Sequence, residues 1–465
     1  MRFQLLPFVL PLALPLALTG SLPGQGTINL QDVLELPSLA TGDLDHALVV
    51  LNDNGDAFAA WQGEDAATGR HQVEGVLIRR ASGLTWTVPQ PADVLLLGDP
   101  SHAVFSSGEE CNKPDVVSLG QDFAVVWARN EPNTGWSQLE VARILVPPAG
   151  PPVVDSAAPG LGWTVDPLVV GGDAGLMPDL AARAAAPGEV AVAYAHETYS
   201  QAAIREYDLR ATTIDLNASP PQIGPIVTLA GPIPVDNTAY GPVGGRVLPD
   251  MVEDDFGHLV IAYESFELAV HNGLAGDEGH VHVHRFAESG GIWTELEHVV
   301  LDGQNLGFRQ RRPNLATSHT DLGNTVSLAW IEQGLRLFAD LDVRYGELEF
   351  LGGAGPGTVA VTHQPFPNLA NRDHAHPAPI HARAFRAVVC CRWYTLKTGI
   401  VAFNAAPPIP ERPLPTNVNW AWRPAADLIE IGQPGAPDSR LIAISYEGDS
   451  LSGSGQAIFV QFFRR

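Results

Sequence analysis

The amino-acid sequence predicts an all-β fold, namely a seven-bladed β-propeller of four-stranded antiparallel blades. Three observations predict this fold class. A sequence pattern returns along the chain, apolar residues alternate with polar ones inside each copy, and the turns carry Gly, Asp and Asn. No long stretch has the 3.6-residue apolar period of an amphipathic helix. Radial repetition of small sheets leaves few exposed sheet edges, so one domain of this kind accounts for the whole repeat array.

The repeated pattern is clearest in LPDMVEDDFGHLVIAYESFE, residues 248 to 267. A Pro-Asp pair precedes a Gly-containing turn, and an alternating apolar run then ends on an aromatic residue. The aromatic anchors of the seven copies are Trp61, Trp127, Tyr194, Tyr263, Trp330, Trp393 and Tyr446, which are 66, 67, 69, 67, 63 and 53 residues apart. We expect Pro-Asp to start the innermost strand and the aromatic to end the second. Burying each ring between blades contributes about 1.5 to 3 kcal/mol.

Further strands complete each copy. We expect third strands at residues 73–80, 139–145, 280–286 and 334–341, each followed by a more variable fourth segment. The last copy ends in GQAIFVQFFRR and supplies only three strands. We expect TINLQDVLEL, residues 27–36, to supply its fourth strand and so to close the ring. The predicted domain spans residues 21–465, with a closing strand in 21–44 and repeats near 45–111, 112–176, 177–247, 248–310, 311–375, 376–424 and 425–465.

The first 20 residues predict a secretory signal peptide. Arg2 precedes an apolar run that continues to Leu18, and small residues follow it. No later apolar run is long enough to cross a bilayer, so we expect no membrane insertion. The sequence therefore predicts a secreted protein, periplasmic or extracellular after removal of the signal peptide.

The charge and the cysteines narrow the chemistry. The formal net charge is -25, from 27 basic and 52 acidic residues, which argues against nucleic acid as a partner because phosphate backbones bind clustered cations. Three cysteines, Cys111, Cys390 and Cys391, are too few for a disulfide framework. Two alternatives remain for Cys390 and Cys391: buried thiols, or a strained pair on one strand.

The Pro-Asp start, the Gly hairpin and the apolar run closing on Trp or Tyr resemble the blades of secreted sialidase-like bacterial β-propellers of the Asp-box type. The resemblance covers the predicted mature chain and concerns the fold. It implies a fold shared by sialidases, other glycosidases, polysaccharide lyases and lectins. The chain departs from sialidases in two ways. No Arg-Ile-Pro-type element occurs in the first 100 residues, and NDNGDAF (52–58) and DDFGHLV (254–260) keep only the Asp and Gly of an Asp box.

Acidic residues recur where the inner strands are expected to begin. The residues are Asp45, Asp115, Asp179, Asp250 and Asp427, with Asn314 in the fifth copy. We expect them to form a ring at the mouth of the central channel. One interpretation is a site for a cation such as Ca²⁺ or for a polar ligand. The other is that each Asp accepts hydrogen bonds from turn amides.

Basic residues are expected on the same face, from four consecutive copies. They are Arg246, Arg309, Arg311, Arg312, Arg372, His374, His376 and Arg423. The planar guanidinium suits carboxylates, so an acidic sugar such as a uronate or a sialate is a candidate ligand. Alternatively, these cations pair with the Asp ring. Glu197 and Tyr199, after the second strand of the third copy, are further candidate ligand-binding residues.

The segment HVHVH places His280, His282 and His284 on one face of an expected third strand. Two adjacent histidines, such as His280 and His282, could bind one Zn²⁺, with a further ligand from His271 or Asp277. The alternative is polar packing on an outer strand.

These observations predict an exported β-propeller that binds an extracellular glycan or protein through its loop-rich face and channel mouth, without catalysis. An alternative is a carbohydrate-active enzyme, a glycoside hydrolase or polysaccharide lyase, that acts on an acidic sugar polymer. A third possibility is a scaffold for partner proteins.

Overall fold

β-Strands make up nearly all the regular structure of the protein, as the period-2 apolar pattern predicts. The computed structural model describes residues 27–29, 32–65, 68–102, 110–131, 136–170, 178–201, 204–236, 247–271, 274–301, 308–317, 325–334, 341–364, 374–382, 385–392, 397–402, 409–413, 422–431, 440–452 and 455–464. The predicted signal peptide lies outside these ranges. The one helix within them is the single 3₁₀ turn η1 (Pro91–Asp93). No helix in the described ranges has the length and apolar character needed to cross a membrane.

Antiparallel pairing joins most of the described strands into sheets of four or five strands, each named here after its innermost strand, and one further small sheet has three strands. The β3 sheet contains β3 (Leu44–Leu51), β4 (Ala57–Asp65), β5 (Arg70–Ile78) and β8 (Leu95–Gly98). The β9 sheet contains β9 (Glu110–Leu119), β10 (Asp122–Glu131), β11 (Trp136–Leu145), β12 (Val153–Asp155) and β13 (Trp163–Val170). The β14 sheet contains β14 (Asp179–Ala182), β15 (Glu189–Gln201), β16 (Ile204–Asp215), β17 (Gln222–Ile223) and β18 (Val227–Asp236).

The remaining sheets follow the same plan. The β19 sheet contains β19 (Asp250–Glu253), β20 (Leu259–His271), β21 (Leu274–Ser289) and β22 (Ile292–Leu301). The β23 sheet contains β23 (Phe308–Ala316), β24 (Thr325–Gly334), β25 (Leu341–Phe350) and β26 (Val359–Gln364). The β27 sheet contains β27 (His374–Ala382), β28 (Phe385–Arg392), β29 (Lys397–Ala402) and β30 (Ile409–Pro413). The β31 sheet contains β31 (Trp422–Glu430), β32 (Arg440–Asp449), β33 (Gln456–Arg464) and β2 (Leu34–Glu35).

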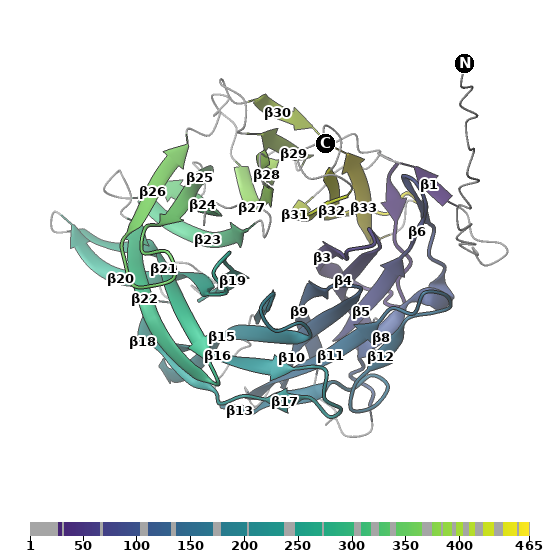
Figure 1. Ribbon diagram of the computed structural model, residues 1–465, viewed down its shortest axis with the longest axis horizontal. Coiled ribbons are helices and arrows are strands. Elements are labelled where there is room, and N and C mark those ends of the chain that lie inside the picture. The colour runs from purple at the N-terminus through teal and green to yellow at the C-terminus, as the bar shows by residue number, and fades with distance from the viewer. Residues whose placement is uncertain are drawn as a thin grey trace, which may run out of the picture.

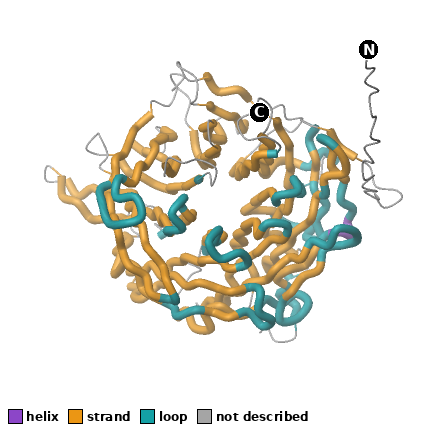
Figure 2. Tube along the Cα trace, in the orientation of Figure 1, coloured by secondary structure: helices purple, strands orange, loops and turns teal. Residues whose placement is uncertain are grey.

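The sheets lie side by side around a central axis, with their first strands turned inward (Figure 1). Strands dominate the trace, and the described loops join them at the rim of the disc and near its centre (Figure 2). This arrangement is an all-β propeller of four-stranded antiparallel blades, and that part of the sequence prediction is confirmed. The β9 and β14 sheets each carry one extra strand, because β13 and β18 also pair with the third strand.

The aromatic anchors pack between neighbouring sheets, as the sequence predicts. Six of them are at most 3% exposed, namely Trp61, Trp127, Tyr194, Tyr263, Trp330 and Tyr446. Trp127 of β10 packs with Phe58 and Val73 of the β3 sheet, and Tyr194 of β15 packs with Val126 of the β9 sheet. Trp393 lies outside the described residues. Each such ring buries apolar area from two sheets at once and so fixes their separation.

Two expectations about strand positions are wrong. The third strand expected at residues 334–341 is instead β25, which begins at Leu341 and buries Val343 and Tyr345 on the alternating face. The Pro-Asp pair also does not start every inner strand. β9 begins at Glu110, and its pairing with β10 skips Lys113 and Pro114. Proline has no N–H to donate to the ladder, so the pair marks a bulge inside the strand.

The segment before β3 bridges the first and last sheets. β2 pairs with β33, and the Leu36 N–H donates to the Ile458 carbonyl oxygen at 2.8 Å. The buried Glu74 of β5 then accepts the N–H groups of Leu39 and Ala40 at 3.0 and 2.7 Å. β1 (Thr27–Asn29) pairs elsewhere, with β7 (Thr85–Thr87), which also pairs with β6 (Arg80–Ser82). The predicted strand at 27–36 is therefore split between two partners.

A fully buried arginine joins the β19 and β23 sheets. The Arg285 guanidinium donates to Asp254 at 2.6 Å and to Glu297 at 3.2 Å, and it reaches the Gly353 carbonyl oxygen at 2.6 Å. The same group lies over the Phe350 ring, 4.8 Å from its centroid. Removal of the cation leaves two carboxylates buried without their charge partner.

We expect Arg285→Ala to lower the free energy of unfolding by about 3 to 5 kcal/mol, because it breaks a buried ion pair from one side. Urea denaturation of the purified protein measures this change. The control is Arg464→Ala, at an exposed position near the end of β33, which should change stability by less than about 0.5 kcal/mol. Equal losses in the two variants would contradict the assignment of Arg285 as a link between sheets.

Candidate functional site

A pocket of about 480 Å³ lies where the inner strands converge. Residues of β3, β9, β14, β19, β23, β27 and β31, or directly before them, line it. The polar lining residues that matter below are Asp45, His46, Asp115, Asp179, Asp250, Glu264, Arg312, Asn314, His376 and Arg423. We call this the mouth pocket. One pocket receives side chains from sheets spread over the whole described chain, so it is the main candidate for ligand binding.

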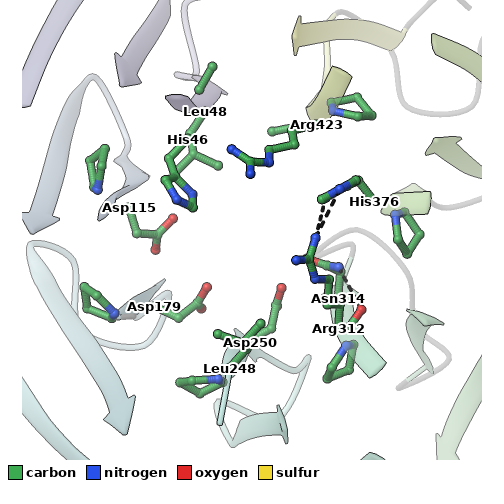
Figure 3. Close-up of a pocket in the computed structure, with 18 of the residues that line it drawn as sticks. His46, Leu48, Asp115, Asp179, Leu248, Asp250, Arg312, Asn314, His376 and Arg423 are labelled. Carbon is green, nitrogen blue, oxygen red and sulfur yellow. Dashed lines mark hydrogen bonds between the residues drawn. The ribbon is translucent and has the colours of Figure 1, made fainter. Parts of the chain in front are cut away.

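Three carboxyl groups form an acidic side of the mouth pocket across from Arg312 and Arg423, while Asp45 lies beside Arg423. Figure 3 shows Asp115, Asp179 and Asp250 projecting their carboxyl groups into the space from one side. Arg312 and Arg423 extend toward them from the other side (Figure 3). A ligand that bears an anionic group at one end and hydroxyl or amine donors at the other would match this division.

The three acidic residues also connect neighbouring inner strands. In the next sheet, another residue occupies the same place in the repeat as each of these acids. The carboxyl group accepts the N–H of the residue directly after it. The bonds run from Leu180 to Asp115 at 2.6 Å, from Met251 to Asp179 at 2.7 Å and from Leu315 to Asp250 at 3.2 Å. These N–H groups belong to inner strands, whose edges face the channel. The carboxyl groups thus serve the fold as well as the pocket.

Burial shifts the protonation of these carboxyl groups. It raises the pKa of Asp115 to about 7 and that of Asp250 to about 8. The pKa of Asp179 is also well above its usual value, because of burial and of the charges on Asp115 and Asp250. Near neutral pH the acidic side therefore carries fewer than three negative charges and can donate O–H hydrogen bonds.

The basic side depends on a recurrent backbone conformation. Among the described residues, five that are not glycine have positive φ between 43° and 54°, namely His46, Lys113, Arg312, His376 and Arg423. Each lies at a bulge of an inner strand. This left-handed conformation costs roughly 1 kcal/mol at each such residue. Side chains from outside the strand stabilise this strained conformation.

Side chains of the preceding sheet hold three of these bulges. The N–H of His46 donates to Glu447 at 3.0 Å, that of Lys113 to Gln62 at 3.1 Å and that of Arg312 to Glu264 at 2.7 Å. Each acceptor directly follows an aromatic anchor in the sequence. The same repeat unit therefore supplies both the packing between sheets and the support for the bulge.

The cations of the pocket contact one another and the acids. Arg312 Nη1 lies 2.9 Å from His376 Nδ1. The pKa of His376 is well below its usual value because of burial and of the nearby Arg312 and His46 charges, so its imidazole is neutral. Arg423 forms an ion pair with Asp45. Burial raises the pKa of Glu447 to about 7, although Arg423, at 3.8 Å, opposes this shift.

The structure places Asp427 away from the mouth. Asp427 lines a second pocket of about 630 Å³, formed by later residues of the same inner strands. Its carboxyl oxygens accept the N–H groups of Leu51 and Leu428 at 2.7 and 2.8 Å. The prediction that Asp427 belongs to the mouth ring is therefore wrong. Ala425, which follows Pro424, holds the position equivalent to Asp115 and lines the mouth pocket, and Asp427 lies two residues beyond it.

Other candidate residues have different outcomes. Asp45 lines the mouth pocket beside Arg423, three residues before the position equivalent to Asp115. Glu197 is buried in β15 and does not line the mouth pocket.

Arg246 and Arg372 lie outside the described residues, and so do the side chains of Tyr199, His374, Arg309 and Arg311. His280 and His282 lie on β21, away from the mouth lining. Sequence reasoning missed His46, whose only signal is a basic residue at the bulge position.

We expect the thermal midpoint Tm to depend on the pKa of Asp250. Asp has a pKa of about 3.9 in unfolded chains. A pKa that is higher in the folded state stabilises the fold most at low pH, and this contribution is lost as pH rises through the folded-state value. The wild-type Tm should therefore fall relative to that of Asp250→Asn as pH rises toward about 8. Differential scanning calorimetry between pH 5 and 9 measures the difference.

Asp427→Asn is the matched control for this experiment. Burial raises the pKa of Asp427 to about 6. The Tm difference between wild type and Asp427→Asn should therefore stop changing above about pH 6, whereas the difference for Asp250→Asn should go on changing up to about pH 8. A Tm difference between wild type and Asp250→Asn that is the same at pH 5 and pH 9 would show that Asp250 titrates normally.

Comparison with known proteins gives similarity at the level of the fold. No family model and no curated protein matches the chain. The chain is similar to the structure of a protein of unknown function from Dyadobacter fermentans, with 12% identity, a TM-score of 0.46 and coverage of 96% of this chain and 100% of the other. It is similar to the GH93 α-L-arabinofuranosidase of Fusarium graminearum, with 12% identity, a TM-score of 0.42 and coverage of 94% and 98%. The sialidase of Trypanosoma rangeli shares 9% identity, with a TM-score of 0.41 and coverage of 95% and 59%.

Proposed function

We propose that this protein is exported and binds an extracellular glycan or protein through the mouth pocket, without catalysis. The observation that carries the proposal is the division of one pocket into an acidic side and a basic side. The export part rests on the leader-like first 20 residues. The mass of the chain purified from culture medium checks the removal of that segment.

An acidic sugar is the ligand class that fits the pocket best. The Arg312 guanidinium lies where a uronate or sialate carboxylate would find charge-assisted donors, and Arg423, which is paired with Asp45, adds positive charge to the same side. The carboxyl groups of Asp115, Asp179 and Asp250 lie across from them and can exchange hydrogen bonds with sugar hydroxyls in either protonation state. Their raised pKa values reduce repulsion of an anionic ligand near neutral pH.

The contacts of the acidic residues favour binding over catalysis. Asp115, Asp179 and Asp250 each accept an N–H from the next inner strand. These bonds give each carboxyl group a structural role that requires no catalysis, so its presence in the pocket is not in itself a sign of an enzyme. The same carboxyl group has further acceptor sites for the hydroxyl groups of a ligand.

The alternative function is a carbohydrate-active enzyme that acts on an acidic sugar polymer. The position of His376 beside Arg312 favours this alternative, because a lyase needs a base next to the group that binds the uronate carboxylate. Product formation from a polyuronate or a sialylated oligosaccharide would support this alternative over binding alone.

We further propose that the seven named sheets form one closed ring of seven blades, with β2 completing the last. Pairing of β2 with β33 supports this proposal, as does the bond from Leu51 of β3 to Asp427 of β31. An experimental structure with another number of blades would contradict it.

We expect Arg312→Gln to weaken binding of an acidic oligosaccharide about tenfold or more, because a hydrogen bond to a charged group is lost. Isothermal titration calorimetry with oligogalacturonate, sialyllactose and a neutral cello-oligosaccharide measures this change. The control is Arg79→Gln, because the Arg79 guanidinium donates to the carbonyl oxygens of Pro147 and Gly150, away from the mouth pocket. Unchanged affinity in Arg312→Gln, or no binding by the wild type to any of these sugars, would contradict the acidic-sugar proposal.

We expect Leu36→Asp to lower the free energy of unfolding by at least about 2 kcal/mol, because it places a charge where an apolar side chain is buried next to β33. Leu39→Asp is the matched control, because Leu39 is 45% exposed three residues later. Chemical denaturation compares the two variants. A loss that is no larger in Leu36→Asp than in the control would count against closure by this segment.

A further inference from the structure

Three histidines gather on one face of the outer strands of the β19 sheet. His282 and His284 are two residues apart on β21 and therefore point to the same side of the sheet. His298 of β22 pairs directly with His284 across the ladder. One ligand nitrogen from each residue lies within 4.8 Å of the other two. The sheet register thus assembles a group that the sequence spacing alone does not reveal.

The rings are already in contact. His282 Nδ1 lies 3.2 Å from His298 Nε2. The His284 and His298 rings stack, with centroids 3.9 Å apart and 10° between their planes. A separation of 3.2 Å is close to the distance between two nitrogens on one tetrahedral ion with bonds of about 2.0 to 2.1 Å.

Neighbouring polar groups orient two of the rings. Ser265 Oγ lies 2.8 Å from His282 Nε2, on the side away from His298. Glu295 lies 3.1 Å from His284 Nδ1, and the Tyr263 hydroxyl lies 3.2 Å from His284 Nε2. Carboxylate and hydroxyl partners of this kind fix the tautomer and the ring orientation of metal-binding histidines.

The ligand atoms of this group are all imidazole nitrogens, which decides the kind of ion that fits. Neutral imidazole nitrogens bind Zn²⁺ and related first-row divalent ions, whereas Ca²⁺ and Mg²⁺ prefer oxygen.

We propose that His282, His284 and His298 bind one Zn²⁺ ion that links β21 to β22. The ion takes the place of the direct contact between His282 and His298. His284 turns from its stacked position and exchanges one of its present hydrogen bonds for the ion. No other His, Cys, Asp or Glu joins the group within the described part of the chain, so the fourth position is open to water or to an external ligand. The site is separate from the mouth pocket, and its test is independent of the proposed function.

This ligand set differs from the pair that the sequence suggests. His280 precedes His282 on the same strand but does not belong to the group. The side chains of His271 and Asp277 lie outside the described residues. His298, 16 residues beyond His282, comes into the group through the register of β21 with β22.

The test uses the untagged full chain after removal of metal with a chelator. Zn²⁺ is titrated by calorimetry, bound zinc is counted by mass spectrometry, and Co²⁺ is added as a spectroscopic substitute. We expect one Zn²⁺ per chain and the absorption bands of four-coordinate Co²⁺. His282→Gln and His298→Gln should each weaken Zn²⁺ binding at least about tenfold, because each loses a direct ligand.

His280→Gln is the matched control, because it removes a histidine from the same strand and the same face. It should leave the Zn²⁺ affinity within about twofold of wild type. A wild-type stoichiometry near zero would show that the three histidines only pack against Tyr263, and would overturn the proposal. Loss of binding in His280→Gln with retention in His298→Gln would overturn the ligand set. Circular dichroism of each variant confirms that it is folded.

Discussion

The fold and the site both depend on a hydrogen bond between neighbouring inner strands. An inner strand pairs with a partner on one side only, so its other edge presents N–H groups toward the channel. Asp115, Asp179 and Asp250 each accept one such N–H from the next sheet. Between the last and first sheets, Asp427 does the same for Leu51, two residues further along both strands. Asn314 stands at the equivalent position in β23, where an amide replaces the carboxyl group.

The burial of these carboxyl groups determines how charge is distributed in the mouth pocket. Burying three acidic side chains near one another raises their pKa values, and the protein places basic side chains opposite them rather than between them. Those basic side chains come from strained bulges, and a neighbouring sheet holds the bulges at His46 and Arg312 through Glu447 and Glu264. Strain of this kind is found where a side chain has to be aimed at a fixed point. The packing between sheets, the bulges and the charge distribution of the pocket are therefore parts of one repeated structure.

The sequence predicts the repeat and its core well, because both depend on local pattern. The spacing of the aromatic anchors identifies the second strands, and six of those anchors are buried between sheets. Asp115, Asp179 and Asp250, which directly follow Pro, line the mouth pocket as expected. Asp427 does not, because it lies two residues beyond the equivalent position, Ala425. A shift of two residues keeps every side chain on its face of the strand, so the apolar alternation alone does not detect it. His298 was missed for a similar reason, since pairing register between strands cannot be counted from spacing in one strand.

The inner strands are joined by the bonds between carboxyl groups and amides, and amide hydrogen exchange resolved by residue tests these bonds directly. The N–H groups of Leu180, Met251 and Leu315 face the channel edge, where an amide without a protein acceptor exchanges quickly. If the carboxyl groups accept them, these three amides should exchange as slowly as the ladder amides of β15 and β20. Exchange as fast as that of the exposed Gly290 turn would show that the inner strands are not joined in this way.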